Sequence, residues 1–102
     1  LRCKLLVNED PVRFASLSDL ATAGGVSLPT LHRLFRRYQG VTPYQYLTRQ
    51  KMNQAGQDLI GTDMLVKEVA EKIGFIDPLH FSRVFKNVHG VSPMRLRESL
   101  SD

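Results

Sequence analysis

The chain has 102 residues, of which 42% are hydrophobic and 24% are charged, and its formal net charge at pH 7 is +4. This length suits one compact domain with a thin core, and the positive charge favours an anionic partner such as nucleic acid or an acidic membrane. A single cysteine, Cys3, excludes a disulfide framework, and no apolar run is long enough to span a membrane. The chain begins with Leu1 rather than Met and carries no signal segment, so we expect a fragment of a longer protein.

A short helix followed by a turn is predicted for LSDLATAGGVS, residues 17–27. Leu17, Leu20 and Ala21 share one helical face, which we expect to lie in the core. The small side chain of Ala21 allows a second helix to cross closely, and Gly25 permits the tight turn between the two helices. A helix, a short turn and a second helix form the arrangement that places the second helix in a DNA groove.

The second helix of this pair is predicted to begin after Ser27, a favoured N-cap residue, and to end at Gly40, which tolerates the left-handed backbone of a helix terminus. Its apolar residues recur at helical spacing and predict one core-facing stripe: Leu31, Leu34, Phe35 and Tyr38. Between residues 20 and 57 the chain has no acidic residue, and the excess of positive charge lies there, on Arg33, Arg36, Arg37, Arg49 and Lys51.

A long helix is predicted over about residues 43–59, with Thr42 as its cap and Pro43 in its first turn. The segment VKEVAEKIGF, residues 66–75, then repeats the pattern of the first short helix, with Ala70 four residues before Gly74. The helix pair is therefore expected to occur twice.

The second helix of the second pair is predicted to start with Asp77 as N-cap and Pro78 as its first residue, where the missing N–H has no cost. Gly90 is expected to end it, and Ser92 is expected to cap a last helix over about residues 93–100. The core-facing stripe of the helix that begins after Asp77 has the same spacing as the stripe of the helix that begins after Ser27: Phe81, Val84, Phe85 and Val88.

The two helix pairs are copies of one frame. Gly74 repeats Gly25 at an offset of 49 residues. Asp77 repeats Ser27 at an offset of 50, which leaves one extra residue, near Ile76, in the second turn. A chain that builds the same unit twice is expected to perform the same kind of binding twice.

The repeat predicts an all-α fold with two helix-turn-helix subdomains joined by a long linker helix. We expect the subdomains over residues 1–42 and 61–102 and the linker helix over residues 43–60. A linker of this length separates the two units by about 25 Å. Two helix-turn-helix units in a chain of net positive charge favour double-stranded DNA as the partner.

These residues resemble the DNA-binding domain of AraC/XylS-type bacterial transcription regulators. The resemblance covers nearly the whole chain and is carried by Leu20-Ala21, Leu31, Arg33 to Arg36, Gly40, Pro43, Tyr46-Leu47, Lys51-Met52, Ala55, Val69-Ala70, Gly74-Phe75, His80 to Lys86 and Gly90 to Pro93. It implies about seven helices and regulation, mainly activation, of cytoplasmic bacterial transcription by two recognition helices in adjacent major grooves. It also implies RNA polymerase as a further partner, no cofactor, no membrane partner, and a sensor or dimerisation domain that this chain lacks.

The resemblance implies which side chains contact DNA. The base-contacting positions are Pro29, His32, Arg33, Pro78, Leu79, Ser82 and Arg83, and the phosphate-contacting positions are Arg36, Arg37 and Lys86. An arginine matches the O6 and N7 atoms of guanine with two hydrogen bonds, whereas a leucine suits the methyl group of thymine. For Arg33 and Arg83, bracing of the fold is the alternative role.

Functions other than DNA binding have less support in the sequence. From residue 58 onward six basic residues meet seven acidic ones, which leaves room for a helix-turn-helix module used mainly for protein contact. The chain has no glycine-rich phosphate loop, paired carboxylates or nucleophile–base arrangement, so we expect that the protein is not an enzyme. His32, His80 and His89 are too widely spaced for a metal site.

Several residues depart from the family pattern. Gly56 lies inside the linker helix, where glycine costs about 1 kcal/mol relative to alanine. Asp58 takes a position where leucine is frequent and is expected to thin the packing there, and Leu65 replaces a frequent proline. Glu68 and Glu71 are expected to form a solvated face of the fifth helix.

Overall fold

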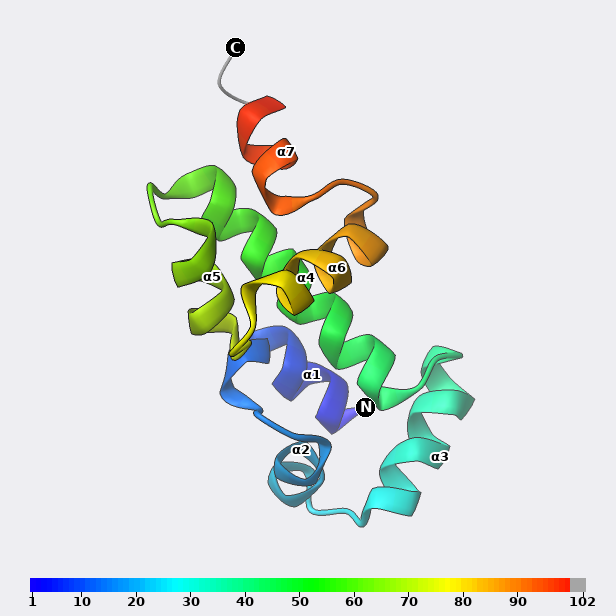
Figure 1. The fold of residues 1–102 in the computed structure, drawn as a ribbon. Coiled ribbons are helices and arrows are strands. Elements are labelled where there is room, and N and C mark those ends of the chain that lie inside the picture. Colours follow the sequence, from blue (N-terminus) through cyan, green and yellow to red (C-terminus); the bar gives the residue numbers. More distant parts are fainter. Residues whose placement is uncertain (100–102) are drawn as a thin grey trace. The chain divides into compact units, whose positions relative to one another are not determined.

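The computed structural model describes residues 1–99, and this part of the chain is entirely helical (Figure 1). In chain order its elements are α1 (Arg2–Glu9), the short 3-10 helix η1 (Pro11–Arg13), α2 (Leu17–Gly24), α3 (Leu28–Gln39), α4 (Pro43–Gly61), α5 (Val66–Ile73), α6 (Pro78–His89) and α7 (Pro93–Ser99). The predicted all-α class with about seven helices is confirmed. The long helix extends two residues further than expected, and the final residue expected for α7 lies outside the described residues.

The chain forms two compact units, Leu1–Gln50 and Lys51–Asp102, which divide inside α4. The first unit contains the helix-turn-helix pair α2–α3, and the second contains the pair α5–α6. The finer division into two subdomains and a separate linker helix stays a prediction.

Side chains and glycines set the helix ends where the sequence predicted them. The Thr30 N–H donates to Oγ of Ser27 over 3.3 Å at the start of α3, and the Leu79 N–H donates to Oδ1 of Asp77 over 3.0 Å at the start of α6. Gly40 has a φ of 70°, the left-handed conformation that ends a helix and that other residues adopt at a cost. The predicted caps of α3 and α6 are therefore confirmed, and they place the first turns of both helices.

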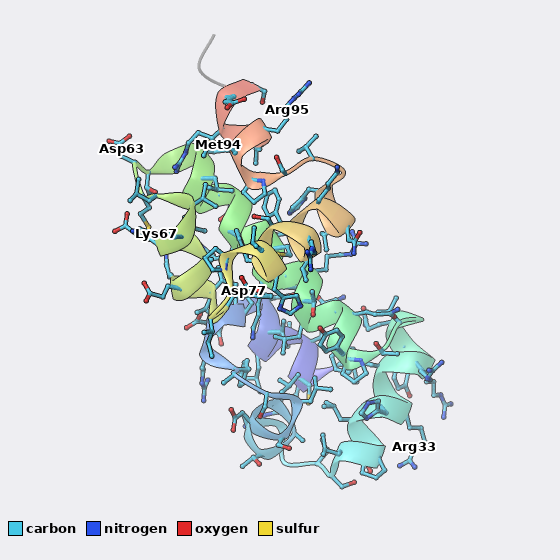
Figure 2. The ribbon with its side chains drawn as sticks, viewed as in Figure 1. Arg33, Asp63, Lys67, Asp77, Met94 and Arg95 are labelled. Atoms are coloured by element: carbon cyan, nitrogen blue, oxygen red, sulfur yellow. The ribbon has the colours of Figure 1, made fainter. Side chains whose placement is uncertain are left out.

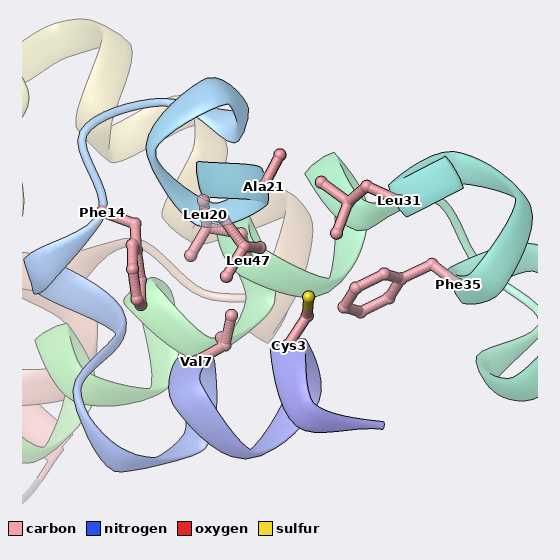
Figure 3. Packing of buried hydrophobic residues seen from close by; sticks show 8 residues of the cluster. All are labelled: Cys3, Val7, Phe14, Leu20, Ala21, Leu31, Phe35 and Leu47. Atoms are coloured by element: carbon pink, nitrogen blue, oxygen red, sulfur yellow. The ribbon is translucent and has the colours of Figure 1, made fainter. Parts of the chain in front are cut away.

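The core of the first unit lies between α1, α2, α3 and the start of α4 (Figure 3). Eight buried side chains form it: Cys3, Val7, Phe14, Leu20, Ala21, Leu31, Phe35 and Leu47. Tyr38 is 58% exposed, so the expectation that it completes the core stripe of α3 is wrong. Its place beside Phe35 is taken by Tyr46 of α4, whose ring centroid is 5.4 Å from that of Phe35. The exposed Tyr38 ring instead makes a cation–π contact with the Arg37 guanidinium, 5.5 Å from the ring centroid. The stripe of α3 therefore ends at Phe35 because a residue from another helix fills the next position.

Gly24, the last residue of α2, makes room for the buried Cys3 of α1. A Cβ atom added to Gly24 would lie 2.3 Å from Sγ of Cys3, well inside van der Waals contact. We expect Gly24→Ala to lower the free energy of unfolding by about 1 kcal/mol, because an overpacking cost of about 1–3 kcal/mol is partly offset by the better helix propensity of alanine, about 1 kcal/mol. Urea unfolding measures the change.

The control for this prediction is the double variant Gly24→Ala/Cys3→Ala, which removes the sulfur that the new methyl group meets. It should be at least as stable as Cys3→Ala alone, since the two changes are coupled through one contact. If Gly24→Ala destabilises the Cys3→Ala protein as much as the parent protein, the clash is not the cause.

The core of the second unit is built around the aromatic residues of α6. Phe81 and Phe85 are fully buried, and their ring centroids are 5.8 Å apart. Phe75, in the turn before α6, packs edge-on against Phe81 at 5.6 Å. His89 stacks on Phe85 at 4.5 Å and donates from Nε2 to the Met52 carbonyl over 3.0 Å, which ties the end of α6 to α4.

Two of the unusual residues in α4 have a clear structural setting. Helix α4 continues through Gly56, and a methyl group there would lie 3.9 Å from Nε2 of His89, an ordinary contact. Asp58 is only 6% exposed, and it fills its position with polar contacts instead of leaving the packing thin. Its carboxylate lies 3.0 Å from Nζ of Lys72 and accepts a 3.2 Å hydrogen bond from Nε2 of Gln54.

Arg97 and Glu68 organise the segment between α4 and α5. The guanidinium of Arg97 donates to the carbonyl groups of Leu59 (3.2 Å), Thr62 (3.2 Å) and Met64. Glu68 is exposed as expected, but it also accepts a hydrogen bond from the Leu65 N–H at 2.8 Å and so caps α5. The view of Glu68 as a purely solvated residue is therefore incomplete, because its carboxylate also satisfies the backbone amide of Leu65 at the start of α5.

Candidate nucleic-acid interface

The first predicted reading face lies on the N-terminal half of α3. Pro29, His32 and Arg33 are all exposed, and their spacing of three and four residues places them on one side of the helix, opposite the buried Leu31 and Phe35. Arg33 projects away from the ribbon of α3 (Figure 2). Among the described residues the guanidinium of Arg33 makes one long contact, 3.4 Å from Nη2 to Oγ1 of Thr30. The structure thus presents this arginine to solvent, with little engagement in the fold.

A contact within α3 orients the ring of His32. Its Nδ1 lies 3.0 Å from the Leu28 carbonyl, which only accepts, so Nδ1 is the donor in this contact. A neutral His32 therefore presents Nε2 as an acceptor, which suits the amino group of adenine or cytosine. Donation from His32 to guanine requires the imidazolium form.

The basic residues predicted to contact phosphate in the first unit lie in the last turn of α3. Arg36 and Arg37 are exposed and follow Arg33 by three and four residues. The helix dipole interacts favourably with cations at this end of a helix, so the place suits two arginines. Lys51, by contrast, is half-buried, and desolvation lowers the pKa of its ammonium group.

The second predicted reading face lies on α6, on the side opposite Phe81 and Phe85. Leu79 and Arg83 are exposed and four residues apart, and Ser82 between them is half-buried. Pro78 is exposed at the first position of the helix, and Lys86 continues the same face beyond Arg83. Within residues 1–99 Arg83 makes no hydrogen bond or ion pair, so in the described part of the chain nothing assigns it a bracing role.

Sequence reasoning missed Arg95 as part of this face. Arg95 and Lys86 line one shallow hollow of about 320 Å³, together with Ser92 and the adjoining backbone. At the position corresponding to Arg95 in the first unit stands Gln45, whose Oε1 accepts a hydrogen bond from the Thr42 N–H over 3.0 Å. The 50-residue offset of the repeat aligns Gln45 with Arg95, so the sequence already contained the signal that a capping residue of the first unit is replaced by a cation in the second.

The described residues show no sign of a metal site or of a membrane-spanning segment. No group of three or more potential metal ligands occurs among residues 1–99. The three histidines are engaged separately, His32 with Leu28, His80 with the Phe75 ring at 5.2 Å, and His89 with α4. None of the helices in this part of the chain is long and apolar enough to cross a membrane.

A model of the helix-turn-helix domain matches residues 20–99, a range that begins inside α2, contains α3 to α7 and includes all the predicted contact residues. The chain belongs to the AraC/XylS-type helix-turn-helix family. It is 42% identical over 78 residues to the transcriptional activator NphR of Rhodococcus sp, an alignment that covers 76% of this chain and 23% of that protein. The chain spans between 23% and 30% of the length of the curated relatives that it matches.

Solved structures share the fold of this AraC/XylS-type chain. A transcriptional regulator with an AraC-type DNA-binding domain from Chromobacterium violaceum superimposes with a TM-score of 0.86 at 28% identity, covering 98% of this chain and 89% of that one. The DNA-binding domain of AdpA, solved in complex with a target DNA, superimposes with a TM-score of 0.84 at 30% identity, covering 96% and 88%. The family assignment made from the sequence is therefore confirmed.

Proposed function

We propose that the protein binds double-stranded DNA in a sequence-specific manner and regulates bacterial transcription. The observation that carries the proposal is the duplicated helix-turn-helix unit with the exposed outer faces of α3 and α6. The second helix of such a unit is the one that enters the major groove. The relative NphR is named as a transcriptional activator, and the AdpA domain is a DNA-binding domain solved with its target, which supports the same activity here.

The roles of the side chains follow from their position and chemistry. Bases are read by the exposed residues near the start of each helix, which are Pro29, His32 and Arg33 on α3 and Pro78, Leu79, Ser82 and Arg83 on α6. Phosphates are contacted by cations further along, which are Arg36, Arg37 and Lys86, together with Arg95 beside Lys86. Phosphate contacts orient the helices, and the base contacts then select the sequence.

The experiment that tests this proposal is a salt titration of binding to duplex DNA. A protein that neutralises phosphates loses affinity linearly with the logarithm of salt concentration, whereas a module for protein contact shows little DNA binding at any salt. Binding would be measured by fluorescence anisotropy on a duplex selected by the protein from a randomised library. Absence of binding to every duplex at low salt would refute the proposed function.

We expect the first unit to supply most of this electrostatic affinity. The double variant Arg36→Ala/Arg37→Ala should flatten the slope by about one to two units, because each phosphate contact contributes about 0.9. Lys86→Ala should flatten it by less, by about 0.9 at most, because it removes a single cation. Lys67→Ala, which removes an exposed cation from α5 outside the proposed contacts, is the control and should leave the slope unchanged. A larger effect of Lys86→Ala than of the double variant would reverse this ranking and reject the expectation.

The proposal extends to the partners and the setting of the whole protein. Relatives named as activators support RNA polymerase as a second partner, and the length of those relatives supports a further sensing or dimerisation domain. A regulator of bacterial promoters acts in the cytoplasm and needs no catalytic activity, cofactor or membrane partner. A pull-down of RNA polymerase on promoter DNA, with and without the protein, tests the first of these points.

A further inference from the structure

The extra residue in the turn of the second unit, Ile76, is fully exposed, with all of its side-chain surface accessible. The residue before it, Phe75, is partly buried and packs against Phe81 and His80. In the first unit, Val26 packs against the core from the corresponding turn. Phe75 therefore takes over the packing role in the second unit, and Ile76 is left without one.

Exposed apolar surface continues from Ile76 into the first turn of α6. Leu79 is 68% exposed, and Pro78 beside it is exposed as well. The acidic residue of this stretch, Asp77, is occupied because its Oδ1 accepts the Leu79 N–H. His80 lies edge-on to the Phe75 ring at 5.2 Å, and the hydrogen-bonding side chains of the reading face, Ser82 and Arg83, lie one turn further along α6. By the 50-residue offset Leu79 aligns with Pro29, so the start of α6 offers a larger apolar side chain at this position, and Ile76 is the extra residue beside it.

We propose, on the basis of the DNA binding proposed above, that Ile76 and Leu79 read thymine through contact with its C5-methyl group. The methyl group of thymine is the apolar feature that the major groove presents, and it distinguishes thymine from the other bases. The β-branched side chain of Ile76 is stiff at χ1, so little rotamer freedom is lost when it makes such a contact. The half-site bound by the second unit therefore carries thymine at two positions, and Ile76 is a specificity-determining residue.

Replacing thymine by uracil tests this directly, because the exchange removes the methyl group and keeps every hydrogen-bonding atom. The protein first selects its site from a randomised duplex library, and each thymine of that site is then replaced singly by deoxyuridine. We expect two replacements within one half-site each to weaken binding about four-fold, the effect of exposing one buried methyl group. Ile76→Ala should weaken binding to the thymine site by a similar factor and should no longer distinguish thymine from uracil at one of the two positions. Leu79→Ala should do the same at the other position.

Ile60→Ala is the matched control, since Ile60 is also apolar and 59% exposed but lies on α4 outside the proposed reading faces. It should keep the full discrimination between thymine and uracil. Because Ile76 makes no packing contribution, its alanine variant should melt at the parent temperature, so a loss of discrimination reports contact with DNA and not unfolding.

The results separate this inference from the proposed function. If the protein binds no duplex, the proposed function fails. If it binds a selected site that has no thymine in the second half-site, or if uracil has no effect, the inference is overturned while DNA binding stands. Discrimination that persists in both alanine variants would assign the methyl contact to other residues and would also overturn it.

Discussion

Replacing Arg97 by alanine should lower the free energy of unfolding by about 2–4 kcal/mol, more than other single substitutions on α7. Its guanidinium bridges the carbonyl groups of Leu59, Thr62 and Met64, so one side chain holds the end of α4 and the segment that leads to α5. Hydrogen bonds from a charged donor contribute about 1.5–3 kcal/mol each, and water replaces part of this where the carbonyl groups are accessible. Urea unfolding followed by circular dichroism measures the loss.

Two further variants show whether the geometry of Arg97 is responsible. Arg97→Lys should recover little stability, because an ammonium group cannot reach three carbonyl groups with the planar fork of a guanidinium. Arg95→Ala, two residues earlier and exposed on the same helix, should change stability by less than about 0.5 kcal/mol. Equal losses for Arg95→Ala and Arg97→Ala would mean that the three carbonyl contacts contribute nothing specific.

The parts of the fold that followed from the sequence are those controlled by neighbours within four residues. Ser27, Thr42 and Asp77 cap the helices they were predicted to cap, because a cap is a contact between a side chain and an amide two or three residues on. The same short range explains why the core-facing and outward-facing sides of α3 and α6 were predictable. Once periodicity places Leu31 or Phe81 in the core, the opposite face of that helix is determined.

The features that sequence reasoning missed depend on contacts between distant segments. Tyr46 displaces Tyr38 from its expected place beside Phe35, and no pattern within α3 carries that information. The contacts of Arg97 join residues that are 33 to 38 positions apart. Ile76 lies between these cases. The offset of the repeat located an extra residue, but only the packing of the partly buried Phe75 in the structure showed that Ile76 is left exposed.

Arg33→Ala should abolish the preference for guanine at one position of the DNA site, at a cost of about 1–3 kcal/mol in binding, and leave other positions unchanged. Arg33 stands on the exposed face of α3, and within residues 1–99 its guanidinium has only the 3.4 Å contact to Thr30, so it is available to form two hydrogen bonds with O6 and N7 of guanine. For the same reason its removal should leave the melting temperature nearly unchanged, which separates a reading role from a bracing role. The measurement is selection from a randomised library by the parent protein and the variant, with thermal melting of both.

Two comparisons make the interpretation of Arg33 specific. Arg33→Lys keeps the charge but not the planar fork, so it should also lose the guanine preference while keeping most of the salt dependence. Arg37→Ala removes an equal charge one turn further along α3 and should weaken binding to all sequences alike, as expected for a phosphate contact. If Arg33→Ala weakens binding uniformly across the site, Arg33 is a phosphate contact like Arg37. If the variant melts far below the parent protein, Arg33 braces the fold, and the base-reading role then passes to His32 and Pro29 on the same face of α3.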